Sequence, residues 1–406
     1  METHTTKIFL GRACFSISKA VNFTDTVSMS SKIIYNTRIL SSSTVSIPPG
    51  GRKLNSKPSL ATIAKRAGVS KTAVCSALNG TEGVSEKTRR RVQQVADELG
   101  YRPNLLARAL RTQRTGMIAL VSYAPYAFVG MPFTGALDLR LREAGLHLVT
   151  ACTYADPQRE RESLEFFTSM GVDGLIVEPQ PAPENLEFYG QLAQQKPLVL
   201  IQDVAPLVSI PASVVCVENQ EVGYCAARHL LDSGRRHVAF LSVPDPDSQF
   251  WWASGRREGC RRALQEAGAP PLISIPIQHT WGEDDRDSSE RSVCEFLSQG
   301  GSVDGIVAVN DGMAFGALRA LAALGLRVPE EVAVVGVDDL PQCQVCTPPL
   351  TSVHIPLARM ANEAADLLKS MLESGLRTPV HRVFSPQLVA RASTLGGQFA
   401  SRAKPR

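Results

Sequence analysis

The chain has 406 residues, more than a single hydrophobic core usually serves, so we expect two or three compact units. Hydrophobic residues make up 44% of the sequence and charged residues 20%, so we expect a globular protein. No apolar run approaches the roughly 18 residues that a membrane helix needs, so we expect no membrane partner. The net charge of +4 is unevenly spread: residues 1–58 carry 8 basic and 2 acidic side chains, residues 59–114 carry 11 and 4, and the remainder carries 24 and 33. A basic N-terminal part, residues 1–114, followed by an acidic remainder indicates that the N-terminal part binds a polyanion. A solvated surface without a partner can have the same composition.

The nine cysteines are odd in number and scattered, unlike a disulfide framework. Cys343 and Cys346 have CxxC spacing, but no second pair and no histidine cluster accompanies them. We therefore expect no metal site, no cofactor and a reducing, cytoplasmic location.

Residues 1–58 are rich in Ser and Thr, poor in acidic residues, and lack the apolar stretch and cleavage site of a secretory signal. Their composition resembles that of an organelle transit peptide. A disordered basic arm, or a start codon assigned too far upstream, explains it as well, and we favour these two explanations. We expect an extension with little ordered structure.

Residues 59–103 are predicted to form three short helices. The first has an apolar face at helical spacing, formed by Leu60, Ile63, Ala64 and Ala67. The second, Lys71–Leu78, begins after the cap residue Ser70. The third begins after Ser85 and ends at Gly100. Two short helices joined by a tight turn at Gly68 and covered by a third are typical of a helix-turn-helix unit. A three-helix bundle without a nucleic-acid role is the alternative.

The polar residues of the second helix favour DNA binding. Lys71, Thr72, Cys75 and Ser76 face outward, and Lys87, Arg89, Arg90 and Arg91 open the third helix. Such a distribution suits a helix lying in a major groove, with phosphates held by its neighbours.

Several motifs of this segment resemble the headpiece of the LacI/GalR family: Ala67-Gly68-Val69-Ser70-Lys71-Thr72-Ala73-Val74, Asn79-Gly80, Val84-Ser85, Thr88-Arg89 and Leu99-Gly100-Tyr101-Arg102-Pro103-Asn104. The resemblance implies that Lys71, Thr72 and Ser76 read bases. The family often has Arg where this chain has Ser76, so the preferred operator base is not implied. The full set of DNA contacts implied is Ser70, Lys71, Thr72, Ser76, Asn79, Arg89, Tyr101, Asn104, Ala107, Arg108, Leu110 and Arg111.

Residues 104–115 are expected to be a hinge helix and linker. The segment 104–111 is too short to be stable as an isolated helix. The family resemblance implies that it orders on DNA as a pair in a dimer and wedges Leu110 into the minor groove, while Arg108 and Arg111 hold the backbone. An ordinary linker helix packed on the body is the alternative.

Residues 116–396 are predicted to form a two-lobed body, followed by a tail at 397–406. Short β-rich runs alternate with amphipathic helical stretches, which indicates parallel sheets covered on both faces. The predicted strands are 117–122, 147–152, 174–178, 198–203, 238–243, 273–278, 305–310 and 332–337. The predicted fold class is therefore an N-terminal all-α headpiece joined to a doubly wound α/β core, with ligands at the carboxyl ends of the strands.

No catalytic or nucleotide-binding motif stands out in the body. The chain from residue 59 to about 395 resembles the LacI/GalR family, whose core shares the fold of periplasmic sugar-binding proteins. That resemblance implies an effector site made of Asp203, Arg256, Trp281, Asn310 and Asp338. Asp, Asn and Arg at strand ends can bind vicinal hydroxyls, and a Trp can cover a pyranose face. Trp251 and Trp252 are expected in a loop that rims the cleft or packs on the surface.

Together these features favour a homodimeric repressor that reads a pseudo-palindromic operator, with an affinity set by a small-molecule effector such as a sugar. The dimer surface is expected to include the helix predicted at Pro132–Ala144. A solute-binding protein of a transport system shares the body but has no use for a headpiece. An α/β enzyme would require a catalytic motif that the sequence lacks.

Overall fold

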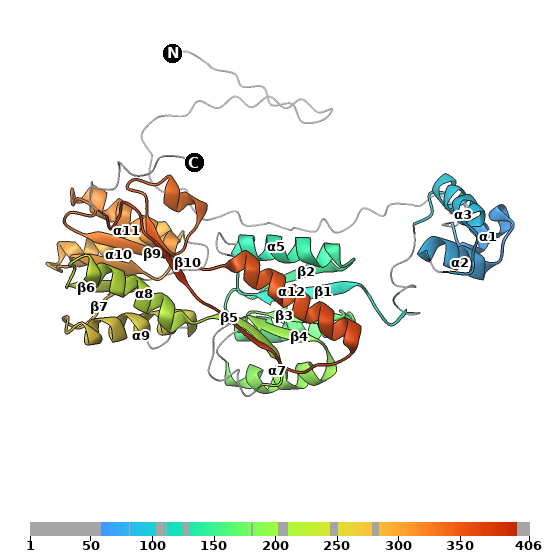
Figure 1. Ribbon diagram of the computed structural model, residues 1–406, viewed down its shortest axis with the longest axis horizontal. Coiled ribbons are helices and arrows are strands. Elements are labelled where there is room, and N and C mark those ends of the chain that lie inside the picture. Colours follow the sequence, from blue (N-terminus) through green and yellow to red (C-terminus); the bar gives the residue numbers. More distant parts are fainter. Residues whose placement is uncertain are drawn as a thin grey trace, which may run out of the picture. The chain divides into compact units, whose positions relative to one another are not determined.

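The computed structural model describes residues 58–80, 82–102, 109, 112–124, 130–179, 182–201, 210–243, 251–277 and 284–395, without the side chains of residues 79, 183 and 184. The chain forms two compact units, Met1–Tyr101 and Arg102–Arg406, which we call the headpiece and the body (Figure 1). None of the helices in the described ranges is both long enough and apolar enough to cross a membrane.

The headpiece consists of α1 (Leu60–Ala67), α2 (Lys71–Asn79) and α3 (Glu86–Glu98). A serine caps each helix: the side chains of Ser59, Ser70 and Ser85 accept hydrogen bonds from backbone N–H groups in the first turn. Helices α1 and α2 end at glycines with positive φ, Gly68 and Gly80, which permit the tight turns. The buried core consists of Ile63, Ala64, Ala67, Val74, Ala77, Val92, Val95 and Ala96.

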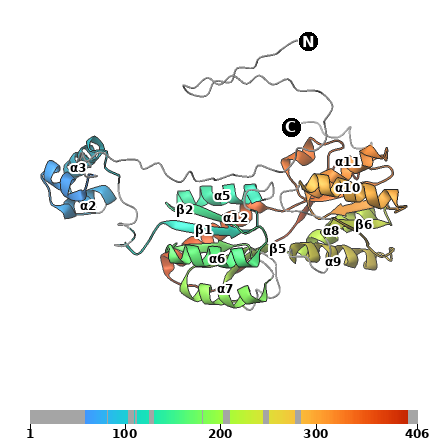
Figure 2. The same cartoon turned by 180° about the vertical axis from the view of Figure 1, so that it is seen from behind.

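The first lobe of the body is built on a six-stranded, fully parallel sheet in the order β2-β1-β3-β4-β5-β11. Helices α5 and α12 cover one face, and α6 and α7 cover the other (Figures 1 and 2). The strands are β1 (Met117–Ser122), β2 (His147–Cys152), β3 (Gly174–Val177), β4 (Leu198–Ile201), β5 (Ser213–Val217) and β11 (His381–Phe384). The helices are α5 (Gly130–Glu143), α6 (Pro157–Ser169), α7 (Pro183–Gln195) and α12 (Leu357–Ser374).

The second lobe repeats this plan with the order β7-β6-β8-β9-β10-β12, in which only β12 is antiparallel to its neighbour. Helices α8 and α9 pack together, as do α10 and α11. The strands are β6 (Val238–Ser242), β7 (Ile273–Pro276), β8 (Gly305–Ala308), β9 (Ala333–Asp338), β10 (Thr351–His354) and β12 (Gln387–Val389). The helices are α8 (Asn219–Asp232), α9 (Trp251–Glu266), α10 (Asp285–Ser298) and α11 (Asp311–Ala323), with a 3-10 turn, η2 (Pro341–Gln344).

The chain passes between the two lobes between β5 and α8, between β10 and α12, and between β11 and β12. Each of the three connections is short. Because the chain crosses three times, each lobe is built from segments that lie far apart in the sequence.

The predicted fold class is confirmed: an all-α headpiece and a two-lobed, doubly wound α/β body. One local expectation was wrong. Trp251 and Trp252 do not lie in a loop but begin α9, whose first turn they form. The predicted strand 198–203 ends at Ile201 within the described residues, and the last position of that prediction, Asp203, lies outside them.

Candidate functional site

The N-terminal end of α2 presents the polar face that the sequence analysis assigned to DNA. Ser70 caps the helix by accepting a hydrogen bond from the Ala73 N–H at 3.1 Å. Lys71 and Thr72, in the first turn, are exposed, and Ser76, one turn further, is half-buried. A helix N-terminus carries partial positive charge, so an exposed lysine beside it suits contact with phosphates and base edges.

Arg89 belongs partly to the internal structure of the headpiece. Its guanidinium donates to the carbonyl oxygens of Ser76 at 3.5 Å and Ala77 at 3.3 Å, and it lies 3.7 Å from the carboxylate of Glu86. Arg89 therefore ties the last turn of α2 to α3. This geometry explains why an arginine suits this position without a DNA contact.

Tyr101 is half-buried against the headpiece core, and burial raises the pKa of its phenol. The side chain of Asn79 lies outside the described residues, as do five other expected DNA contacts: Asn104, Ala107, Arg108, Leu110 and Arg111. These positions remain predictions.

The body contains a cavity, open to solvent, that is lined by residues of both lobes. Three of the expected effector residues, Arg256, Asn310 and Asp338, line it. Asp203 and Trp281 lie outside the described residues. The complete lining is Tyr123, Glu178, Ile201, Cys216, Val217, Asn219, Trp252, Arg256, Asn310, Asp338, Ile355, Leu357 and Met360.

Two polar lining residues that the sequence analysis missed, Tyr123 and Glu178, follow β1 and β3 directly. In the first sheet the strand order reverses between these two strands, and open α/β sheets bind ligands at such a point. Burial raises the pKa of Tyr123 well above its usual value, and the nearby carboxylates of Glu178 and Asp338 raise it further. A strand-end rule combined with the strand order would have found both residues.

Arg256 is held in place by four neighbours. Its Nη1 donates to the Val309 carbonyl at 2.6 Å and its Nε to Asn219 Oδ1 at 3.1 Å. Its Nη2 lies 4.0 Å from Asp338 Oδ1, and its guanidinium lies 5.0 Å from the centre of the Trp252 ring. Only 7% of the residue is exposed, so this cation is fixed by protein acceptors before any ligand arrives.

Asp338, the last residue of β9, is 5% exposed and adopts a φ of 109°, a region that strongly favours glycine. Its Oδ2 accepts no hydrogen bond within the described residues. Burial raises the pKa of this carboxyl to about 8, against the opposing effect of Arg256. A buried carboxyl oxygen without a donor is costly, so a ligand that supplies a donor there gains binding energy.

Buried side chains fix the turn that carries Asp338. Asp311 accepts hydrogen bonds from Leu340 N at 2.8 Å, Cys343 Sγ at 3.1 Å and Ser352 Oγ at 2.6 Å. Asp339, next in sequence and also at positive φ, pairs with Arg391 at 2.6 Å. Cys343 of the CxxC pair thus serves as a hydrogen-bond donor in this network.

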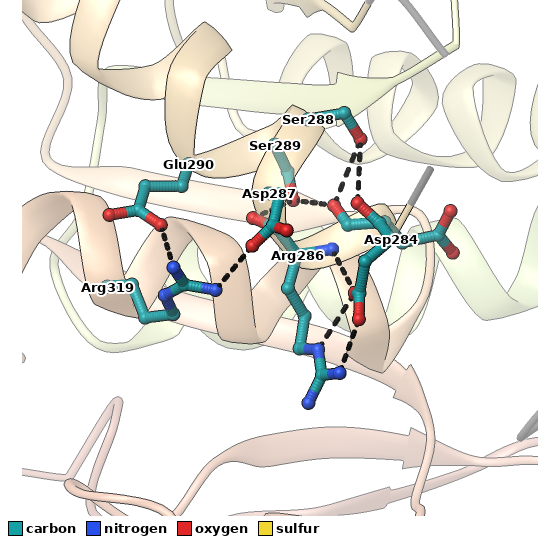
Figure 3. Close-up of polar contacts among 8 residues, drawn as sticks. Asp284, Arg286, Asp287, Ser288, Ser289, Glu290 and Arg319 are labelled. Carbon is teal, nitrogen blue, oxygen red and sulfur yellow. Dashed lines mark hydrogen bonds and ion pairs between the residues drawn. The ribbon is translucent and has the colours of Figure 1, made fainter. Parts of the chain in front are cut away.

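Asn310 has a second role beside lining the cavity. Its Oδ1 caps α11 by accepting from Met313 N at 2.8 Å, and its Nδ2 donates to Asp285 Oδ2 at 3.2 Å. The start of α10, where Asp285 lies, is fixed by a polar network in which Arg319 of α11 reaches Asp287 and Glu290 (Figure 3). Asn310 is thereby held in one orientation.

Comparisons with known proteins agree with this architecture. The model of bacterial regulatory proteins of the lacI family matches residues 59–104, and that of a periplasmic binding protein-like domain matches residues 227–394. The HTH-type transcriptional regulator DegA of Bacillus subtilis is 31% identical over 346 residues, which cover 83% of this chain and 98% of DegA. The chain belongs to the LacI family.

Solved structures of LacI-family proteins share its fold. The crystal structure of the lac repressor dimer bound to operator and an anti-inducer has a TM-score of 0.73 at 23% identity, covering 83% of this chain and 99% of that one. The complex of the transcriptional regulator CelR with cellobiose has a TM-score of 0.58 at 29% identity, with the same coverage. This LacI-family chain is a transcriptional regulator with a DNA-binding helix-turn-helix headpiece and a periplasmic-binding-protein-like body.

Proposed function

We propose that the protein is a homodimeric repressor whose affinity for a pseudo-palindromic operator changes when a small, hydroxylated effector occupies the cavity of the body. One observation carries the proposal: a single chain combines a headpiece that exposes Lys71 and Thr72 at a helix N-terminus with a body whose cavity is lined by residues of both lobes. A solute-binding protein would have no use for the first feature.

The DNA-binding part of the proposal rests on α2. Its inner residues Val74 and Ala77 are buried in the headpiece core, and its polar face remains accessible. In this proposal Lys71, Thr72 and Ser76 contact base edges, and neighbouring basic residues hold phosphates. Two headpieces, one from each subunit, read the two half-sites.

The effector part rests on the cavity and on a relative. Asn310 and Asp338 lie at or beside strand ends, and Arg256 lies on α9. Trp252, whose ring contacts the Arg256 guanidinium, adds an aromatic side chain to the lining. CelR, a relative solved with cellobiose, supports a saccharide as the class of effector. Because the cavity is lined from both lobes, an occupant that contacts both favours one arrangement of the lobes over others.

The dimer part rests on α5, where two large apolar side chains are exposed: Met131 at 54% and Leu139 at 64%. Apolar side chains that a single copy leaves in water are suited to burial in a subunit interface. We propose that α5 contributes to that interface.

Fluorescence anisotropy with labelled DNA from the region upstream of the gene tests the proposal. We expect nanomolar binding by full-length protein that weakens steeply with salt, and at least a tenfold loss of affinity in Lys71→Ala/Thr72→Ala. Lys369→Ala, which removes one exposed lysine on α12, is the control and should bind as the wild type does. Binding that survives the double substitution unchanged would refute the role of α2.

A further inference from the structure

The first two turns of α3 carry an excess of positive charge. Lys87, Arg89, Arg90 and Arg91 follow a single carboxylate, that of Glu86. Cations are unfavourable at this end of a helix, because its unpaired N–H groups already carry partial positive charge. Like charges four residues apart, such as Lys87 and Arg91, also repel each other. Glu86 alone does not balance these charges, so this end of the headpiece favours an anion from outside.

Two of the three arginines are already engaged within the headpiece. The Arg89 guanidinium donates to the carbonyl oxygens of Ser76 and Ala77 and lies 3.7 Å from the carboxylate of Glu86. Arg90 Nε donates to the same carboxylate, at Oε1, at 3.3 Å. Arg89 and Arg90 thus share one acidic partner, and neither requires DNA to be paired.

Arg91 differs from both in its partners and in its place. It is exposed, and it forms no ion pair with any residue that the structure describes. Its Nη2 lies 3.7 Å from the position that a Cβ on Gly68 would occupy. Gly68 caps α1 and begins the turn that leads to α2 at Lys71. The Arg91 guanidinium therefore lies against the turn of the helix-turn-helix, next to the start of α2.

This location suits contact with the DNA backbone. In the proposed function, Lys71 and Thr72 bring the N-terminal turn of α2 to the base edges of a major groove. That groove is about 12 Å wide and is bordered by the phosphates of both strands. A side chain that lies against the turn before α2 comes close to one of these borders. The planar guanidinium of Arg91 can bind a phosphate through two N–H groups at once.

We propose that Arg91 binds a phosphate of the strand that borders the groove, and that Arg91, rather than Arg89 or Arg90, anchors α3 to the duplex. This inference rests on the proposed function and adds a residue to its DNA-binding surface. A phosphate contact reads no base, so Arg91 strengthens binding to every duplex and helps to fix the orientation of α2 in the groove.

Two variants of equal net charge test this role. Arg91→Gln and Arg90→Gln are made in the full-length protein, and anisotropy measures their affinity for the upstream DNA and for an unrelated duplex of equal length over a range of salt concentrations. Each phosphate contact contributes about 0.9 to the slope of log affinity against log salt. Because the proposed homodimer has two headpieces, Arg91→Gln should lower this slope by about 1.8 on both duplexes.

That change in slope corresponds to a loss of affinity of about 30-fold at 0.15 M salt, relative to 1 M. Arg90→Gln removes the same charge one residue away and should change the slope by less than half as much. Equal slopes for Arg90→Gln and Arg91→Gln would overturn the inference, because the effect would then be one of net charge and not of a contact.

A third variant separates a phosphate contact from support of the fold. Arg91→Lys keeps the charge but not the planar guanidinium, and it should retain most of the wild-type slope. The circular dichroism and melting curve of each variant show whether its headpiece is folded. If Arg91 only supports the turn at Gly68, Arg91→Lys and Arg91→Gln lose binding together, and the inference is wrong.

The wild-type protein, measured in the same experiment, separates this inference from the proposed function. If the wild type shows no salt-dependent binding to either duplex, the proposed function fails and the inference fails with it. If the wild type binds and Arg91→Gln keeps the wild-type slope, the DNA-binding function stands and only the role of Arg91 is wrong.

Discussion

Asp338 combines two unfavourable features at one position: a buried carboxyl with an oxygen that lacks a donor, and a backbone φ that favours glycine. Strained and unsatisfied groups are retained where they serve a ligand. Asp311 and Arg391 hold the surrounding turn and keep Asp338 in this unfavourable conformation. Asp338 therefore lowers the free energy of unfolding of the ligand-free protein.

The pH dependence of stability follows from this residue. Burial raises the pKa of Asp338 to about 8 and that of Asp311 to about 6, whereas the unfolded value is near 3.9. Between these values the folded chain binds more protons than the unfolded chain, so stability falls as the pH rises from about 4 to about 8. We expect the melting temperature of the body to drop over this range.

Asp338→Asn should flatten this decline and make the variant more stable than the wild type at pH 8.5, with each kcal/mol raising the melting temperature by about 2–4 °C. Scanning calorimetry from pH 5 to pH 8.5 measures the effect. Asp366→Asn, which removes an exposed carboxylate on α12, is the control. Parallel pH profiles for Asp338→Asn and the wild type would contradict the origin we assign to the decline.

At this scale the sequence predicted the site only in part. Asp338 and Asn310 could be predicted because each lies at or beside the carboxyl end of a buried apolar run. Arg256 was predicted from the family resemblance alone. Tyr123 and Glu178 also follow strands, but their importance depends on β1 and β3 being neighbours at the reversal of strand order. That order is set by contacts between distant segments, which no local pattern encodes.

Among the secondary-structure elements, α8 and α9 make an unusually close contact that depends on glycine. A Cβ on Gly223 would lie 1.7 Å from the Arg256 carbonyl oxygen, and one on Gly259 would lie 1.9 Å from that of Gln220. The two backbones meet with no room for a side chain. This contact brings Asn219, at the start of α8, within hydrogen-bond reach of Arg256.

Gly223→Ala should therefore cost about 3 kcal/mol or more of unfolding free energy, because the clash is with backbone and cannot be relieved by a rotamer change. Gly190→Ala is the matched control: it lies within α7, a Cβ there meets nothing within 4 Å, and helix propensity predicts a gain of about 0.5–1 kcal/mol. Urea denaturation measures both. A Gly223→Ala protein as stable as the wild type would show that α8 and α9 can separate freely.

The elements that were predicted lie within a few residues of their observed bounds, but β5, α8, β10, α12, β11 and β12 were not predicted. The omission of β5 and α12 is not due to a weak pattern, because β5 is a buried apolar run and α12 has one buried apolar face. Strands β11 and β12 are short and largely exposed, so they have no apolar alternation to recognise. Trp251 and Trp252 were expected in a loop, but they are the first two residues of α9.

As a whole, the molecule has separate cores for the headpiece and the body. The headpiece core is small, and a core of this size provides little stability alone. We therefore expect two thermal transitions for the free protein, a minor one for the headpiece and a major one for the body.

Ile63→Ala should remove about 2–5 kcal/mol from the headpiece and abolish its transition together with DNA binding, while the body melts as in the wild type. Leu175→Ala, a substitution of similar size in the first lobe, should shift only the major transition. Differential scanning calorimetry distinguishes the two effects. A single transition that both substitutions shift equally would show that the units unfold together.

The interleaving of the two lobes also determines when each can be completed during synthesis. Strand β11 joins the sheet of the first lobe, and β12 joins that of the second. Ser393 then bonds back to Val334 and Thr351, which closes the second lobe. Both lobes must wait for these late residues to leave the ribosome, so a nascent chain that stalls before β11 exposes an unpaired edge in each sheet and becomes a substrate for chaperones or proteases.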